Sequence, residues 1–172
     1  MNLRFIRLLI YSLISFALEK IKKIYFTTNY YNNSLKVSPP SRSYDMNNVP
    51  LLLELEDKNE KRLELLNRFH KNIWKLDNIS KKHSVELHKF NWLSQIDIKN
   101  QKHLVKNIIL AWLKKNQNYN EKNWHHKITT NRIIFWICCS HFTIRHDDMV
   151  YRAAITNNIV KQALHLNKNL AF

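Results

Sequence analysis

Hydrophobic side chains recur with helical spacing through the second half of the chain. Apolar residues three and four positions apart predict amphipathic α-helices in four segments: 84–96, 100–116, 129–142 and 147–166. Ser84 is a suitable N-cap for the first helix, and Asp147 or Asp148 for the last. The apolar positions predicted to face the core are Leu87, Phe90, Leu93, Ile96, Leu104, Val105, Ile108, Ile109, Trp112, Leu113, Ile133, Ile134, Trp136, Ile137, Phe142, Met149, Ala153, Ile159, Val160, Ala163 and Leu164.

Short connections join these four segments, and the longest of them is the polar stretch 116–128. Successive helices with short connections pack as antiparallel helical hairpins. No useful length of sequence alternates apolar and polar residues as a half-buried strand does. The pattern therefore predicts an all-α fold.

Residues 1–26 form a first unit with a different pattern, because an apolar run from Phe5 to Leu18 fills most of it. The run is shorter than the roughly 20 apolar residues of a membrane span. A signal peptide carries its charge before the apolar run, whereas lysines 20, 22 and 23 follow it here, and Ser15-Phe16-Ala17 is a poor cleavage site. We expect a helix that packs on its own domain or lies on a membrane surface, with a cleaved signal as the alternative.

Residues 27–50 are polar and contain all three prolines, which predicts a linker or an irregular surface crossing. A third unit, 51–172, begins with charged residues between leucines at 51–66, the pattern of a short helix. The stretch that follows looks irregular. The apolar residues expected to anchor it to the core are Phe69, Ile73, Trp74 and Leu76.

The chain contains no glycine, which excludes P-loops and GxGxxG nucleotide-binding turns. Turns with positive φ would then use asparagine, the residue that tolerates the left-handed region best after glycine. Three asparagine pairs stand where turns are wanted: Asn32-Asn33, Asn47-Asn48 and Asn157-Asn158.

The formal net charge of +15 suits an acidic partner such as nucleic acid, anionic lipid or an acidic polysaccharide. Mutational bias is an alternative explanation for the charge. Lys, Asn and Ile all have A/T-rich codons, so a genome that drifts toward A and T gains lysines without selection for binding. The basic residues form short pairs rather than a stripe, and the tryptophans fall on apolar faces, so nucleic acid is the weaker choice of partner.

Residues 123–142 concentrate histidine, cysteine, arginine and tryptophan in twenty positions. Neighbouring cysteines on a helix point about 100° apart and the sequence has no C-x-x-C, so we expect no metal site. A Cys138–His141 nucleophile pair is three positions apart, but Phe135-Trp136-Ile137 precede it and favour buried, inert thiols. The five residues in the candidate zinc pool are His125, His126, Cys138, Cys139 and His141.

An ordered series of motifs across residues 66–166 is more specific than helix patterning. It begins with Phe69 and continues through segments with W-L pairs, a W…R…W segment and Q-x-x-H-L. In order and spacing this series resembles the N-terminal helical region of heparinase II/III-like proteins. The matching residues are Phe90, Trp92, Leu93, Trp112, Leu113, Trp124, Arg132, Trp136, Gln162, His165 and Leu166. The family's glycine before the arginine is replaced at Thr130-Asn131, and its F-x-F segment is kept only as Phe69.

The resemblance implies that residues 51–172 form the start of an incomplete (α/α) toroid. Members of this family resemble polysaccharide lyases that cleave acidic polysaccharides by β-elimination and carry a β-sandwich after the toroid. Their catalytic residues lie in segments beyond the matched region, so the resemblance assigns no catalytic residue, metal or cofactor here. It implies a fragment that is inactive alone, with an acidic polysaccharide as partner once the missing part, such as a companion chain, is supplied.

Three residues are candidates for lining the toroid's cleft. The Arg132 guanidinium could pair with a carboxylate or sulfate, or could brace a neighbouring helix. Trp92 and Trp136 could stack on sugar rings, or could belong to the core. We expect a bacterial protein, cytoplasmic or membrane-associated, or periplasmic if residues 1–26 act as a signal. The alternative function is a basic all-α module that binds nucleic acid or an anionic membrane surface.

Overall fold

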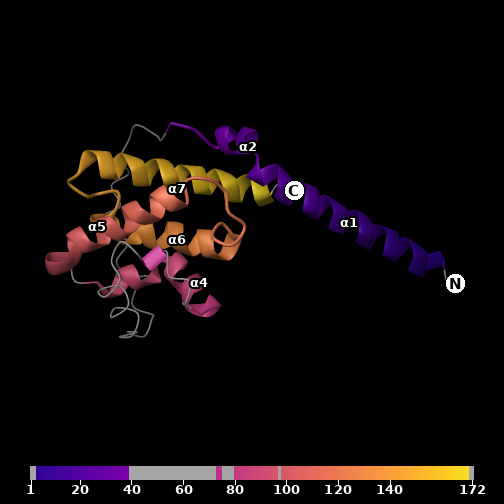
Figure 1. Ribbon diagram of the computed structural model, residues 1–172, viewed down its shortest axis with the longest axis horizontal. Helices are drawn as coiled ribbons and strands as arrows, with labels where there is room; N and C mark the ends of the chain where they lie inside the picture. The colour runs from indigo at the N-terminus through magenta and orange to yellow at the C-terminus, as the bar shows by residue number, and fades with distance from the viewer. Residues whose placement is uncertain (1–2, 39–72, 75–79, 97, 171–172) are drawn as a thin grey trace.

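A computed structural model of the chain describes residues 3–38, 73–74, 80–96 and 98–170 (Figure 1). The regular elements in this part of the chain are all helical, with no strand among them, so the all-α prediction is confirmed. The predicted helix 51–66, the second half of the predicted linker (39–50), Phe69 and Leu76 lie outside the described residues. The first half of that linker is not wholly irregular, because residues 29–34 form a short helix. The elements are α1 (Leu3–Thr27), α2 (Asn29–Ser34), α4 (Lys81–Lys89), the 3-10 helix η3 (Asn91–Gln95), α5 (Ile98–Lys115), α6 (His126–Cys138), the 3-10 helix η4 (Ser140–Phe142) and α7 (Met149–Leu170).

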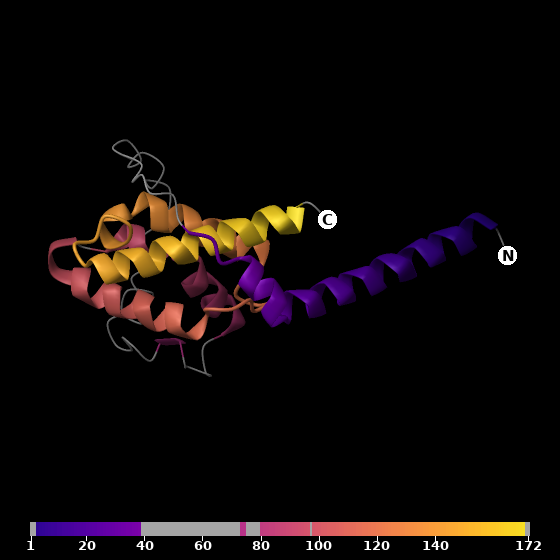
Figure 2. The same ribbon diagram turned by 90° about the horizontal axis from the view of Figure 1, so that it is seen from above.

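Helices α4 to α7 form a body in which α7 packs against both α5 and α6, and α4 packs against α6 (Figure 2). The main hydrophobic core lies among these helices and takes most of its residues from α5 and from the α4–η3 segment. Ile73 and Trp74 join this core, and the Trp74 indole donates a hydrogen bond to the Ile108 carbonyl at 2.9 Å. Their predicted role as anchors is therefore confirmed.

The first predicted helix of the body is wrong in its bounds. It begins earlier, where Ser80 rather than Ser84 is the N-cap and accepts a hydrogen bond from the His83 amide at 3.3 Å. It also ends earlier, because Phe90 takes a left-handed backbone conformation (φ 61°) and the chain continues as η3. Left-handed backbone is unfavourable for a bulky residue, but the Phe90 side chain is fully buried among aromatic rings. Core packing therefore overrides the helical period at this point.

The buried faces of α6 and α7 differ from the predicted ones. Ile134, Met149, Ala153 and Ala163 were expected inside but are exposed. The face of α7 that enters the body instead carries Tyr151, Ile155 and three polar residues, Asn158, Gln162 and His165. On α6 the buried face includes Thr129, Arg132 and Trp136. Apolar periodicity missed these faces because polar side chains occupy half of them.

The asparagine pairs do not mark turns in the described part of the chain. Asn32-Asn33 lies in α2 and Asn157-Asn158 lies in the middle of α7, while Asn47-Asn48 is outside the described residues. Phe90 is the residue there with positive φ. At the start of α7 the predicted cap is confirmed, because Asp148 Oδ1 accepts a hydrogen bond from the Tyr151 amide at 3.0 Å.

Helix α1 projects away from the body, and its N-terminal end lies far from all the other helices (Figures 1 and 2). Phe26 is the buried residue of α1. Phe26 packs with Tyr31, Leu35 and Trp124 in a second, smaller hydrophobic cluster, which we call the root cluster. The expectation that residues 1–26 pack on their own domain therefore holds only for the last turns of the helix. No described helix is long and apolar enough to cross a membrane.

Candidate functional site

Arg132 is the chemically most distinctive residue of the body, because its guanidinium is completely buried at the centre of the helices. Its Nε donates a hydrogen bond to Gln162 Oε1 at 2.7 Å, which joins α6 to α7. Its Nη1 donates to the His88 carbonyl at 3.1 Å and to the Asn123 carbonyl at 3.0 Å, which adds α4 and the connection before α6. Its Nη2 donates to Thr129 Oγ1 at 3.2 Å. The Arg132 side chain thus connects α4, the segment before α6, α6 itself and α7.

The charge of Arg132 is supported by aromatic faces and neutral acceptors. The guanidinium carbon lies 4.4 Å from the centre of the Trp112 ring and 5.9 Å from that of Trp136. No carboxylate of the described residues forms an ion pair with it. Burial lowers the pKa of Arg132 to about 9, so it remains charged at neutral pH. A buried charge is costly unless it is well hydrogen-bonded, and this network provides those bonds.

Aromatic rings surround the guanidinium. The Phe90 ring centre lies 5.3 Å from that of Trp92 and 5.1 Å from that of Trp136. Trp112 and Trp136 meet edge to face at 5.4 Å, and the Trp112 indole donates a hydrogen bond to His88 Nδ1 at 2.8 Å. The pKa of His88 is lowered to about 3, first by burial and then by the charges of Arg132 and Lys115. His88 is therefore neutral at neutral pH and serves as an acceptor.

His165 links the Arg132 network to the root cluster. It lies one turn beyond Gln162 on the buried face of α7, and its Nδ1 is 2.7 Å from the Tyr31 hydroxyl. The His165 ring also meets those of Trp124 at 5.4 Å and Phe26 at 5.3 Å. Burial is the main reason that the pKa of His165 is lowered to about 4. This residue joins the end of α1 and α2 to the body.

The three candidate cleft residues come together, but inside the core. Trp92, Arg132 and Trp136 each have no exposed surface, so none of them faces a cleft. The contacts of Arg132 are those of the bracing role, which was the alternative for this residue. The sequence pattern indicates no buried contact for His88 or Tyr31, and it places Asn158 at a turn rather than in the core. The helical spacing of the polar residues 158, 162 and 165 in α7 could have indicated a polar buried face on this helix. Tyr31 could not be found in this way, because it lies far away in sequence.

The residues of the candidate zinc pool do not converge. Within the described residues no group of three histidine, cysteine or acidic side chains is close enough to hold a metal. Cys138 and Cys139 are both free, and Cys139 is buried. Burial raises the pKa of both thiols, that of Cys139 to about 12, so neither is a thiolate at neutral pH. Reactive cysteines have the opposite shift.

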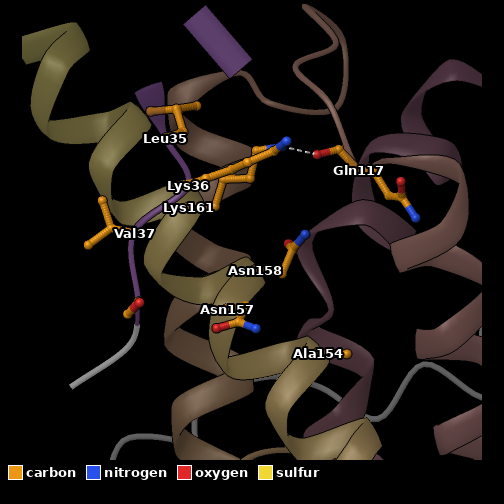
Figure 3. Close-up of a pocket in the computed structure, with 9 residues that line it drawn as sticks. Leu35, Lys36, Val37, Gln117, Ala154, Asn157, Asn158 and Lys161 are labelled. Atoms are coloured by element: carbon orange, nitrogen blue, oxygen red, sulfur yellow. Dashed lines mark hydrogen bonds between the residues drawn. The ribbon is translucent and has the colours of Figure 1, made fainter. Parts of the chain in front are cut away.

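Two shallow hollows on the surface of the body are wide enough to consider as binding sites. One, with a volume of about 490 Å³, lies between α7, the segment after α2 and the end of α5 (Figure 3). Lys161 crosses it and donates a hydrogen bond to the Gln117 carbonyl. The other, of about 640 Å³, is lined by His125, His126, Lys122 and Lys127 around the start of α6. Among the described residues, no aspartate or glutamate lines either hollow.

Comparison of the chain with protein-family models, with curated proteins and with solved structures finds no match. Its function must therefore be argued from its own residues.

Proposed function

We propose that this chain is the N-terminal helical scaffold of a heparinase II/III-like polysaccharide lyase, and that it has no lyase activity alone. In this proposal α4 to α7 are the first helices of an (α/α) toroid with antiparallel hairpins. The remaining toroid, the β-sandwich and the catalytic groups come from polypeptide outside these 172 residues. The ligand of the assembled protein is an acidic polysaccharide.

One observation supports this proposal above the others: nearly all the residues that carry the family resemblance are buried in the main core or in the adjoining root cluster. Of the eleven matching residues, all except Leu166 are buried. They come from five separate segments of the chain, and Arg132 contacts Trp112, Trp136 and Gln162 directly. Apolar residues are buried in any helical core, so the support comes from the polar members Arg132, Gln162 and His165, which are also buried. A shared scaffold requires such burial, because a buried guanidinium needs its whole set of acceptors.

The main departure from the family pattern is tolerated locally. Thr130 and Asn131, which replace the family's glycine, lie inside α6 and have ordinary helical backbone. A glycine is required only where φ is positive or where backbones approach closely. Its replacement therefore leaves α6 able to place Arg132.

The alternative of a nucleic-acid-binding module has less support. Single-stranded nucleic acid is bound by exposed aromatic rings beside a basic groove. All five tryptophans are buried here, at Trp74, Trp92, Trp112, Trp124 and Trp136.

The test is reconstitution. The purified chain is incubated with uronate-containing polysaccharides, and the unsaturated uronate produced by β-elimination is followed by ultraviolet absorbance. We expect no product from the chain alone. We expect product when the chain is co-expressed with the β-rich polypeptide encoded directly downstream, and we expect the two to co-purify.

Arg132→Met is the scaffold variant for this assay, and Arg145→Met, on an exposed side chain, is its matched control. Arg132→Met should abolish both co-purification and product, while Arg145→Met should retain them. Product formed by the unaided chain would contradict the proposal, because the catalytic groups would then lie within it. So would a downstream sequence that encodes nothing β-rich.

A further inference from the structure

Helix α1 exposes apolar side chains along nearly its whole length. It rises about 1.5 Å per residue, so its 25 residues extend roughly 37 Å from the root cluster. An exposed apolar surface of this extent marks a place of interaction. The large side chains exposed on it are Leu3, Phe5, Leu8, Leu9, Ile10, Tyr11, Leu13, Ile14, Phe16, Leu18, Ile21, Ile24 and Tyr25.

The apolar and polar residues of α1 are unevenly distributed around its axis, with Leu8 and Leu18 on the flanks of the polar side. At 100° per residue, one line along the helix is wholly apolar: Ile6, Leu13, Ala17 and Ile24. The opposite line carries the polar or basic residues Arg4, Ser15 and Lys22, together with the exposed ring of Tyr11. This helix is not apolar enough to cross a membrane. An apolar line and modest overall hydrophobicity are the properties of a helix that lies in the plane of a membrane interface.

Charge identifies the kind of surface that this helix suits. Basic residues stand near both ends of α1, at Arg4, Arg7, Lys20 and Lys22, and its one acidic residue is Glu19. Lys20 Nζ lies 5.4 Å from the Phe16 ring centre, so this long side chain extends along apolar surface with its charge at the edge. Two copies of a chain with a net charge of +15 repel each other. An anionic surface attracts the same charges.

The C-terminal end of α1 is held to the body by an ion pair and by aromatic packing. Lys23 pairs with Glu19 at 3.1 Å and with Glu121, in the connection before α6, at 2.8 Å. Phe26 is buried against Tyr31 and His165. A helix held at one end and apolar along the rest can insert its free part without disturbing the body.

We propose that α1 lies in the plane of an anionic phospholipid membrane, with its apolar line among the acyl chains and its basic residues at the headgroups. The body is held beside the bilayer by the root cluster. This attachment does not depend on the lyase scaffold, since it uses a different part of the chain.

The experiment is vesicle flotation of the full chain. Phosphatidylcholine vesicles containing phosphatidylglycerol are compared with pure phosphatidylcholine vesicles. Affinity should be roughly tenfold or more higher for the anionic vesicles and should fall as salt is raised. Helicity is followed by circular dichroism in both samples.

Leu13→Asp and Ser15→Asp are the matched variants, because they add the same charge two residues apart on different faces of α1. Leu13→Asp replaces an exposed apolar side chain that the acyl chains would cover in the proposed complex, and it should weaken binding to anionic vesicles by at least about tenfold. Ser15→Asp changes only the charge and should weaken it by at most about fivefold.

Three results would overturn the proposal. One is that the chain binds neither the anionic vesicles nor the pure phosphatidylcholine vesicles. Another is equal loss of binding in the two variants, which would mean that charge alone acts. The third is self-association of the chain that Leu13→Asp abolishes while vesicles bind nothing, which would make a second copy the occupant.

Discussion

Helices α1 and α5 have similar amphipathic sequences but opposite environments. On α5, Val105, Ile108 and Trp112 have no exposed surface. On α1, the comparable residues Leu8 and Leu13 are 68% and 61% exposed. Helix α5 packs against α7 and η4, whereas α1 packs only at its C-terminal end, against α2 and the root cluster.

This contrast distinguishes two properties of a helix: which of its faces is apolar, and whether that face is buried. Periodicity determines which face of a helix is apolar. Whether that face is buried depends on what lies opposite, which is set by segments elsewhere in the chain or by another surface. For α5 that partner is α7 and η4. For α1 no such partner is found among the described residues. The following changes test this distinction, beginning with the largest expected effect.

Trp112→Ala should cause the largest loss of stability, because it removes a fully buried indole from the centre of the body. The change creates a cavity, removes the donor to His88 Nδ1 and removes the ring that lies against Arg132. We expect the free energy of unfolding to fall by about 3–5 kcal/mol. Urea denaturation followed by circular dichroism measures it. Leu110→Ala, at an exposed position of the same helix, should cost much less; equal losses would mean that α5 is not packed as described.

Arg132→Met should be the next most harmful change. It keeps an unbranched apolar side chain but leaves Gln162 and the carbonyls of His88 and Asn123 without their donor. We expect a loss of about 2–4 kcal/mol, because buried unsatisfied acceptors are costly. The same denaturation assay applies. The matched change at the exposed Arg145 should stay within about 0.5 kcal/mol, and a neutral result at Arg132 would mean that the network does not stabilise the body.

Acidification should destabilise the body by a smaller amount. The folded pKa values of His88 and His165, about 3 and about 4, lie below the ordinary value of 6.5. At a pH between the folded pKa values and 6.5, these histidines bind more protons in the unfolded chain than in the folded one. The free energy of unfolding is therefore highest, as far as these histidines are concerned, above about pH 6.5 and falls as the pH is lowered. We expect a loss of roughly 1–2 kcal/mol per histidine between pH 6.5 and 5, measured by urea denaturation at each pH.

His165→Gln should make that pH profile shallower, while His103→Gln, at an exposed position of α5, should leave its shape unchanged. The comparison uses the slope of the profile, so it is not affected by a uniform loss of stability in the variant. An unchanged slope in His165→Gln would contradict the burial of a neutral imidazole at the root cluster.

Leu13→Asp on α1 should have the smallest effect on the isolated chain. Its side chain is mostly exposed and remote from the body, so the free energy of unfolding should change by no more than about 0.5 kcal/mol. The same assay measures it. A loss of several kcal/mol would show that the apolar face of α1 is packed against the chain, and the contrast between α1 and α5 would disappear.

Part of this structure could be predicted from local pattern. The fold class, the long helices and the buried face of α5 follow from apolar spacing, since Val105, Ile108, Ile109, Trp112 and Leu113 are all buried. The cap at Asp148 follows from the preference of acidic and hydroxyl side chains for that position. These features depend on residues close in sequence.

The candidate site could be predicted only in part. The resemblance selected Arg132, Trp92 and Trp136 and left Arg132 either at a cleft or as a brace. Its acceptors outside α6 are His88, Asn123 and Gln162, which lie 44, 9 and 30 positions away. No pattern within one helix could identify them. The polar face of α7 could not be predicted either, because its partner, the Arg132 guanidinium, comes from another helix. Gln162 accepts a hydrogen bond from that guanidinium and donates one to Asn158.

The sequence by itself determined that the chain is helical, glycine-free and strongly basic, and which line of each helix is apolar, because these depend on composition and on short-range spacing. The tertiary structure alone decided that a charged arginine belongs to the core, that Phe90 ends α4 in a left-handed conformation, and that α1 remains unpacked. The physical reason is that burial of a charge, strain in the backbone and exposure of an apolar face are each acceptable only when distant groups compensate for them.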